Sequence, residues 1–297
     1  MGSTRVNLTE NRTPMFRVLS DDQKETLFNG MIRTLNGTGA HVHNEKAREI
    51  LYSNGCTVAD DNLTVYIPPD VVRKALSTVP PTTEVFCWDG DKEKKIVIER
   101  GRSYFGPGPT PPNFIDPETL ERRPYLRKDA SVVARVCDAL PNMGYVQSLG
   151  SISDVTGELA DIYEFADMIR NTTTPIMSWS FAREGCRDEH RMAIAMAGGE
   201  DEFKHKPNYI FYGEPISPLV SDFHAIDKCM YCAENRIPQV YSPCAIGGGT
   251  VPATHAGQLI VALSESMVGV VTAQLINPGT CVIIGGVQSI LDMRHSI

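Results

Sequence analysis

The sequence predicts an α/β protein of the TIM (β/α)8-barrel type, with the barrel incomplete in this chain and an α+β cap region before it. Two observations predict this fold. Beyond residue 126, short extended segments rich in Ile, Val and Tyr alternate with helical patterns. These segments begin near residues 145, 175, 209, 238 and 281, and a (β/α)8 barrel uses about 30 residues for each strand and helix. The regular spacing favours a barrel over an open doubly wound sheet.

Residues 1–125 are predicted to form the α+β cap. Ser20 and Gln23 form a capping box at the start of a helix, and Pro69 begins another. The run CTVADDNLTVYIP indicates a hairpin that turns at residues 60–62. A second hairpin is expected where TEVFCWD and KKIVIE flank the polar turn DGDKEK.

Residues 126–297 are predicted to form the first part of the barrel. A helical pattern over 129–140 precedes five strands, and helical patterns follow the first four of them. The strands are expected at 145–149, 175–180, 209–213, 238–241 and 281–285. Eight units need roughly 250 residues, and about 170 follow residue 125, so we expect about three C-terminal units to be missing. The alternative is a five-stranded Rossmann-like sheet, although no GxGxxG motif follows any strand.

Composition excludes several classes of protein. The net charge of −8 argues against nucleic-acid binding, which requires a basic surface. We expect the eight cysteines to be reduced and buried, including Cys229 and Cys232, whose CxxC lacks a second ligand pair. The N-terminal segment lacks the apolar core of a signal peptide, and Ser264, Glu265 and Ser266 interrupt the longest apolar run. The sequence therefore predicts a cytoplasmic protein that does not bind membranes.

Aromatic side chains and one carboxylate are predicted near strand ends, where TIM barrels place their chemistry. The candidates for substrate binding are Tyr104, Phe105, Trp179, Phe181, Tyr212, Glu214 and Tyr241. Ring faces and a counter-charge are what a quaternary ammonium requires, because it has no N–H to donate. The alternative is that Trp179 and Tyr212 fill the core. No Ser-His-Asp order and no HxH or HExxH motif is present, so no catalytic residue or metal ligand is assigned.

Several ordered motifs resemble the trimethylamine methyltransferase family of corrinoid-dependent enzymes. They are YFGPGP, IFYGEPISPLVSD and IPQVYSPCAIGGGTVPATHAGQLIVALSESMVGVVTAQLINPG, and the resemblance extends over nearly the whole chain from about Arg17. It implies a TIM barrel that binds a methylamine and passes a methyl group to the cobalamin cobalt of a separate corrinoid protein. In the founding enzymes pyrrolysine lies beyond the position of Ile297. Relatives without it use quaternary amines such as glycine betaine.

The resemblance also suggests where the partner and substrate bind. Glycines are expected to leave room near the corrinoid or substrate, namely Gly247, Gly248, Gly249, Gly285 and Gly286. The leading hypothesis is a quaternary-amine:corrinoid methyltransferase that acts on glycine betaine and forms a homo-oligomer. The alternatives are a pyrrolysine-dependent trimethylamine enzyme and a betaine-binding protein without turnover.

Overall fold

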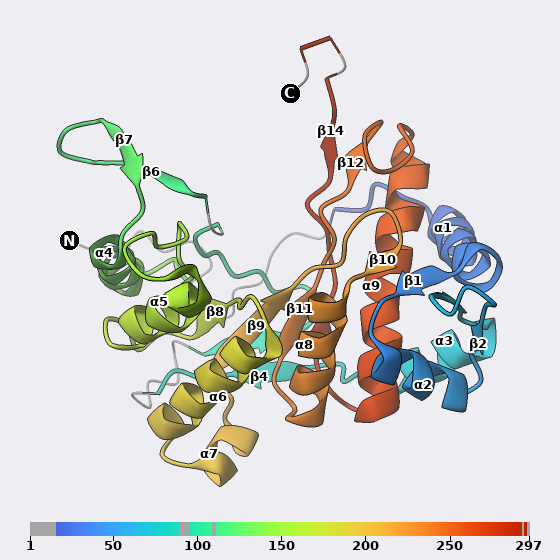
Figure 1. Ribbon diagram of the computed structural model, residues 1–297, viewed down its shortest axis with the longest axis horizontal. Coiled ribbons are helices and arrows are strands. Elements are labelled where there is room, and N and C mark those ends of the chain that lie inside the picture. The colour runs from blue at the N-terminus through green and yellow to red at the C-terminus, as the bar shows by residue number, and fades with distance from the viewer. Residues whose placement is uncertain (1–15, 89–94, 109–110, 293, 296–297) are drawn as a thin grey trace. The chain divides into compact units, whose positions relative to one another are not determined.

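The computed structural model describes residues 16–88, 95–108, 111–292 and 294–295, and the chain divides into two compact units (Figure 1). Unit 1 contains the described residues of 81–211, and unit 2 contains 16–80 together with the described residues of 212–297. This division groups 16–80 with the C-terminal part of the chain. It differs from the predicted cap and barrel regions, whose boundary near residue 125 stays a prediction.

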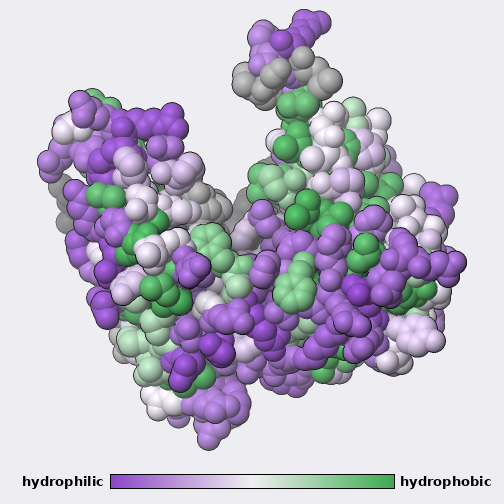
Figure 2. All heavy atoms as spheres, viewed as in Figure 1, coloured by the Kyte–Doolittle hydropathy of each residue, from purple (hydrophilic) through white to green (hydrophobic). Residues whose placement is uncertain are grey.

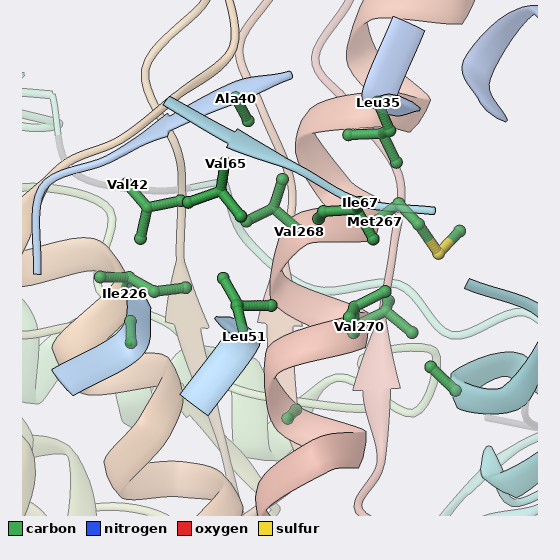
Figure 3. Close-up of a cluster of buried hydrophobic side chains, with 14 of the residues drawn as sticks. Leu35, Ala40, Val42, Leu51, Val65, Ile67, Ile226, Met267, Val268 and Val270 are labelled. Carbon is green, nitrogen blue, oxygen red and sulfur yellow. The ribbon is translucent and has the colours of Figure 1, made fainter. Parts of the chain in front are cut away.

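Unit 2 is built around helix α9 (His255–Ile276), which is red in Figure 1 and contacts α1, α3 and α8. The other helices of the unit are α1 (Asp21–Arg33), followed by a π-turn (Thr34–Thr38), α2 (Glu45–Ser53), α3 (Pro69–Thr78) and α8 (Phe223–Glu234). Met267, Val268 and Val270 of α9 lie in one apolar cluster with residues of α2, α8 and a small sheet (Figure 3). By length and composition alone α9 could cross a membrane, but 67% of its most apolar window is buried, as in a core helix.

The small sheet of unit 2 joins distant parts of the chain. Its strands are β1 (Ala40–Val42), β2 (Thr57–Val58), β3 (Thr64–Tyr66) and β10 (Val220–Ser221), in the order β10-β1-β3-β2. β1 pairs parallel with β10 and antiparallel with β3. Two further parallel pairs are β11 (Gln239–Tyr241) with β13 (Val282–Ile283), and β12 (Ile246–Gly247) with β14 (Ser289–Ile290).

Unit 1 combines two hairpins with a parallel strand–helix arrangement. The hairpins pair β4 (Thr83–Val85) with β5 (Ile96–Ile98), and β6 (Asn113–Ile115) with β7 (Arg122–Pro124). β8 (Ile176–Ser178) pairs parallel with β9 (Tyr209–Gly213), which runs across the boundary into unit 2. The helices are α4 (Arg127–Ala139), a 3-10 turn (Gly157–Leu159), α5 (Ala160–Ile169), α6 (Arg183–Ala197) and α7 (Glu200–His205).

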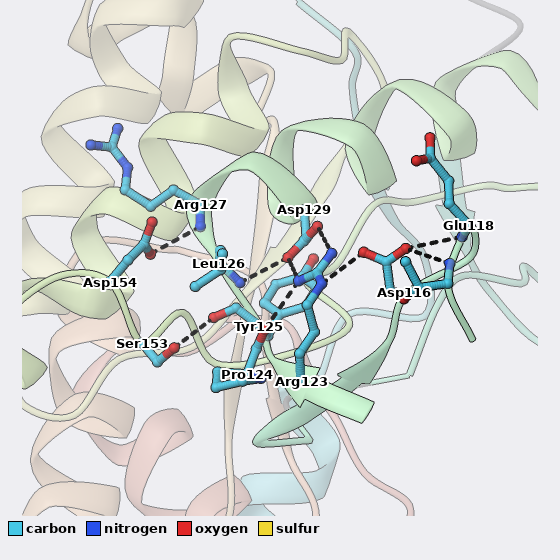
Figure 4. Close-up of polar contacts among 11 residues, drawn as sticks. Asp116, Glu118, Arg123, Pro124, Tyr125, Leu126, Arg127, Asp129, Ser153 and Asp154 are labelled. Atoms are coloured by element: carbon cyan, nitrogen blue, oxygen red, sulfur yellow. Dashed lines mark hydrogen bonds and ion pairs between the residues drawn. The ribbon is translucent and has the colours of Figure 1, made fainter. Parts of the chain in front are cut away.

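An ion-pair network fixes the start of α4 (Figure 4). The Arg123 guanidinium donates two hydrogen bonds to Asp129, at 2.6 and 2.8 Å, and a third to Asp116 at 2.8 Å. Asp129 also accepts a hydrogen bond from the Leu126 amide, which lies at the first turn of the helix. This two-pronged guanidinium–carboxylate geometry holds the β6–β7 hairpin against the helix that follows it.

The structure confirms most of the expected elements. The Ser20 capping box, both hairpins and the strands near 176, 209, 239 and 282 are present, although the turn at 89–94 lies outside the described residues. The expected strand at 145–149 is reduced to one parallel bridge between Val146 and Ile176. The fold is mixed α/β with parallel pairs, as predicted, and the strands of the described ranges do not close a barrel.

Polar residues cover much of the face of each unit seen in Figure 2. Six of the eight cysteines are buried, as expected, including Cys229 and Cys232 within α8. The other two depart from the expectation of burial, because Cys244 is exposed in the segment that follows β11 and Cys281 is half-buried.

Candidate functional site

In unit 2 the end of β9 carries a phenol–carboxylate pair. The Tyr212 hydroxyl donates a hydrogen bond to Glu214 Oε2 at 3.1 Å. Burial, and then the negative charge of Glu214, raise the pKa of Tyr212, so the phenol keeps its proton and remains a donor. Glu214 itself is exposed. The pair therefore places an oriented, exposed carboxylate at the carboxyl end of a parallel strand.

Two more segments lie beside this pair. The Ser242 amide, just after β11, donates to the Gly213 carbonyl at 3.2 Å, and the Val287 amide donates to the Pro243 carbonyl at 3.1 Å. The ends of β9, β11 and β13 are thus side by side. We give the name strand-end surface of unit 2 to four of the exposed residues there, Glu214, Cys244, Gly285 and Gly286. Glu214 supplies the carboxylate of this surface.

A buried glutamate anchors the loop that leaves Glu214. Glu265 of α9 is 1% exposed and accepts hydrogen bonds from the Ser217 hydroxyl and the Leu219 amide, both at 2.8 Å. Burial raises the pKa of Glu265, and the two hydrogen bonds partly oppose that shift. From the sequence, Glu265 was noted only as an interruption of an apolar run. Its role as a hydrogen-bond acceptor was missed because its partners are almost 50 residues away in the sequence.

The predicted glycines differ in the structural reason that excludes a side chain at each position. A side chain at Gly247 would lie 2.5 Å from the Gln258 amide nitrogen, and one at Gly286 would collide with Gln288. Gly248 has φ +81°, and a Cβ at Gly249 would lie 3.2 Å from Ile246 Cγ2. A Cβ at Gly285 would meet only an ordinary contact, 3.6 Å from Ser242 Oγ. Gly285 is therefore the glycine of this set with the least local structural reason to lack a side chain.

In unit 1 two aromatic residues follow β8. Trp179 and Phe181 pack edge to face, with ring centroids 4.7 Å apart and an interplanar angle of 80°. Trp179 Nε1 donates to Glu164 Oε1 at 3.1 Å, and the Phe181 amide donates to Asp161 Oδ2 at 3.0 Å. Glu164 was absent from the sequence candidates. The available signal was the spacing of three residues between Asp161, Glu164 and Asp167, which puts three carboxylates along one side of α5.

Two of the remaining aromatic candidates, Tyr104 and Tyr241, have structural partners. Tyr104 is half-buried, and its hydroxyl oxygen accepts a hydrogen bond from the Val97 amide at 2.9 Å. Phe105 is 68% exposed. Tyr241 is fully buried in the core cluster of unit 2, and its hydroxyl donates to Ser221 Oγ at 3.0 Å. Across the described ranges, no group of three or more His, Cys, Asp or Glu residues is arranged to hold a metal ion.

The structural comparison shows the fold. The crystal structure of the Methanosarcina barkeri monomethylamine methyltransferase (MtmB) matches with a TM-score of 0.56 and 11% identity, over 92% of this chain and 55% of that one. A second solved structure, the hydroxylamine complex of MtmB, gives the same TM-score. The mixed α/β architecture is thus shared with MtmB.

Sequence comparison shows the family. The trimethylamine methyltransferases MttB of Desulfitobacterium hafniense and Methanosarcina barkeri are 27% and 28% identical, each over 93% of this chain. A glycine betaine methyltransferase of Desulfitobacterium hafniense is 27% identical over 95%. The chain spans 55–58% of the length of these curated relatives. A sequence model of the trimethylamine methyltransferase (MTTB) family matches residues 2–296, and the chain therefore belongs to this family.

Proposed function

We propose that the protein transfers a methyl group from a quaternary amine, with glycine betaine as the first substrate to test, to the cobalt of a corrinoid protein. Family membership supports the class of reaction. The relatives named for trimethylamine and for glycine betaine are 27–28% identical to this chain, so identity favours neither amine over the other. The choice of a quaternary amine depends on the chemistry of the strand ends.

The observation that carries the proposal is the Tyr212–Glu214 pair at the end of β9. A quaternary ammonium cannot donate a hydrogen bond, so it is held by ring faces and by an uncompensated negative charge. Glu214 supplies the charge, and the Tyr212 hydroxyl fixes the direction of its carboxylate. We leave Tyr241 out of the proposed site because its ring belongs to the core of unit 2.

The proposed reaction requires no general acid or base from this chain. The corrinoid, carried by the partner protein, supplies a Co(I) nucleophile that accepts the methyl group. A quaternary nitrogen leaves as a neutral amine, so no side chain has to deliver a proton to it. Glu214 of the strand-end surface binds and orients the cation. The bare backbone at Gly285 leaves room for a partner to approach this surface.

The two alternatives make different demands. A trimethylamine enzyme requires activation of its substrate by pyrrolysine, which the mass of the complete gene product would reveal. A betaine-binding protein requires only the cation site, and it would bind glycine betaine without removing a methyl group.

The test is methyl transfer by the complete gene product with its cognate corrinoid protein. Glycine betaine, carnitine and trimethylamine are supplied in turn, and methylcobalamin is followed by its absorbance. We expect transfer from glycine betaine, and Glu214→Gln should weaken substrate affinity by about 2- to 5-fold, as for an exposed cation contact. Glu49→Gln, an exposed glutamate of α2, is the matched control. Absence of methylcobalamin with all three amines would reject the proposal, and calorimetric binding of betaine without transfer would favour the binding protein.

A further inference from the structure

Two buried carboxylates of α5 hold the aromatic residues that follow β8. Asp161 and Glu164 lie nearly one helical turn apart and are 3% and 2% exposed. Glu164 accepts the indole N–H of Trp179 at 3.1 Å, and Asp161 accepts the Phe181 amide at 3.0 Å. One face of one helix therefore fixes both the side chain of the first aromatic residue and the backbone of the second.

We propose that Glu164 is a positioning residue that orients the Trp179 indole, and that Trp179 and Phe181 form a two-ring binding surface in unit 1 for a methylated ammonium group. The choice of ligand rests on the proposed function. The positioning role of Glu164 rests on the contacts within unit 1.

The geometry of the rings suits a cation. The two rings pack edge to face, Trp179 is half-buried and Phe181 is 49% exposed, so a ligand can reach the pair. Among aromatic residues, Trp makes the strongest contact with a cation. A carboxyl oxygen that accepts the indole N–H polarises the ring toward greater electron density, which strengthens that contact. Fixing the rotamer before binding also lowers the entropy lost when the ligand arrives.

Asp161 is held in its own place by α6. A Cβ at Gly185, in the first turn of α6, would collide with Asp161 Oδ2, so the glycine gives this carboxylate its space. The N-terminus of a helix favours a negative group beside it. Asp161 thus links the start of α6 to the Phe181 backbone.

The protonation of Glu164 gives a readout of its role. Burial raises the pKa of Glu164 to about 7, although the hydrogen bond from the Trp179 indole acts in the opposite direction. Other titratable groups that act on Glu164 or feel its charge are Asp161 on α5, Tyr125 before α4 and Glu189 on α6. Burial raises the pKa of Tyr125 above its ordinary value of 10, and burial also raises that of Glu189.

The first experiment follows Trp179 emission in the 297-residue chain. The sequence has two tryptophans, so Trp88→Phe leaves Trp179 as the only one. We expect the emission of Trp179 to change with pH, with a midpoint near pH 7. Adding Glu164→Gln should abolish this change around pH 7. Adding Glu189→Gln instead should preserve it. The same titration in the Glu164→Gln protein would overturn the positioning role.

The second experiment measures binding of glycine betaine by the change in Trp179 emission. Glu164→Leu removes the acceptor and should weaken binding about 5- to 30-fold, the range for a partly desolvated cation–ring contact. Glu164→Gln keeps an acceptor for the indole N–H and should stay within about threefold of the parent, with circular dichroism confirming that both variants fold. Equal affinities in all three proteins would overturn the effect of Glu164 on binding, and no change in Trp179 emission with saturating glycine betaine would overturn the binding surface even if methyl transfer is intact. Absence of methyl transfer in the wild-type complex would instead reject the proposed function and leave the pH titration as the test of Glu164.

Discussion

Glu164 should make the stability of unit 1 depend on pH across the neutral range. Its pKa is about 7 in the folded protein, against an ordinary value of 4.5. Between these two values the folded state binds more protons than the unfolded state, so the free energy of unfolding falls as pH rises. The stabilisation is fully present below pH 4.5, and its loss is complete once the pH passes about 7. A pKa difference of about 2.5 corresponds to about 3 kcal/mol.

Other groups titrate in the same window, so the comparison has to isolate Glu164. Burial raises the pKa of Glu265 and Glu189, which act in the same direction. Burial lowers the pKa of His190 from 6.5 to about 4, which acts in the opposite direction because the fold favours its neutral form. The difference between the wild type and Glu164→Gln removes the shared contributions of Glu265 and His190, and it leaves only the part of the Glu189 shift that comes from the Glu164 charge.

The assay is urea denaturation in the Trp88→Phe background, where Trp179 emission reports on unit 1. Free energies of unfolding are measured for the parent and for Glu164→Gln at intervals from pH 4.5 to pH 8. Between pH 4.5 and pH 8, the free energy of unfolding of the parent should fall by about 3 kcal/mol more than that of the variant. Parallel curves for the two proteins would refute the reasoning, since they would mean that Glu164 ionises equally well in both states.

Three further predictions concern unit 2. Glu265→Ala leaves the Leu219 amide without its acceptor and should lower the free energy of unfolding by about 2–5 kcal/mol in urea denaturation, whereas Glu265→Gln should cost less. Gly269→Ala would drive a methyl group into the Tyr241 ring and should cost about 1–3 kcal/mol, seen as a lower Tm. Gly285→Ala should change the free energy of unfolding by no more than about 0.5 kcal/mol but slow methyl transfer. Gly248→Ala, at φ +81°, should instead lower the free energy of unfolding by about 1 kcal/mol. Normal methyl transfer by the Gly285 variant would contradict the role of Gly285 in leaving room for the partner.

Local signals predicted the elements well because their causes lie within a few residues. The Ser20 hydroxyl and the Gln23 side chain cap each other's backbone amides across three positions, and the sequence shows both. Pairings between distant segments are different. β1 at residues 40–42 pairs with β10 at 220–221, and no pattern in either segment identifies the other. The grouping of 16–80 with the C-terminal part was therefore not foreseen.

For the candidate site, strand ends were predictable and side-chain direction was not. Alternation along β11 puts Gln239 and Tyr241 on the same face of the strand. In the structure that face meets the helices, because Gln239 donates to the Cys229 carbonyl of α8 and Tyr241 packs on Gly269 of α9. A shift of one residue in the register of β11 would have turned Tyr241 toward the opposite face of the strand. The sequence shows no preference between the two faces.

The two carboxylate–aromatic pairs have the same bonding pattern and opposite exposure, and exposure decides what each can do. In both, an aromatic donor reaches a glutamate: Trp179 to Glu164 at 3.1 Å and Tyr212 to Glu214 at 3.1 Å. Glu164 is buried, so a full negative charge there is costly and its pKa is raised to about 7. A cation would have to lose its own hydration to benefit from that carboxylate directly. Glu214 is exposed and needs no such desolvation, so it suits the role of counter-charge, whereas Glu164 acts on a ligand only through the ring that it holds.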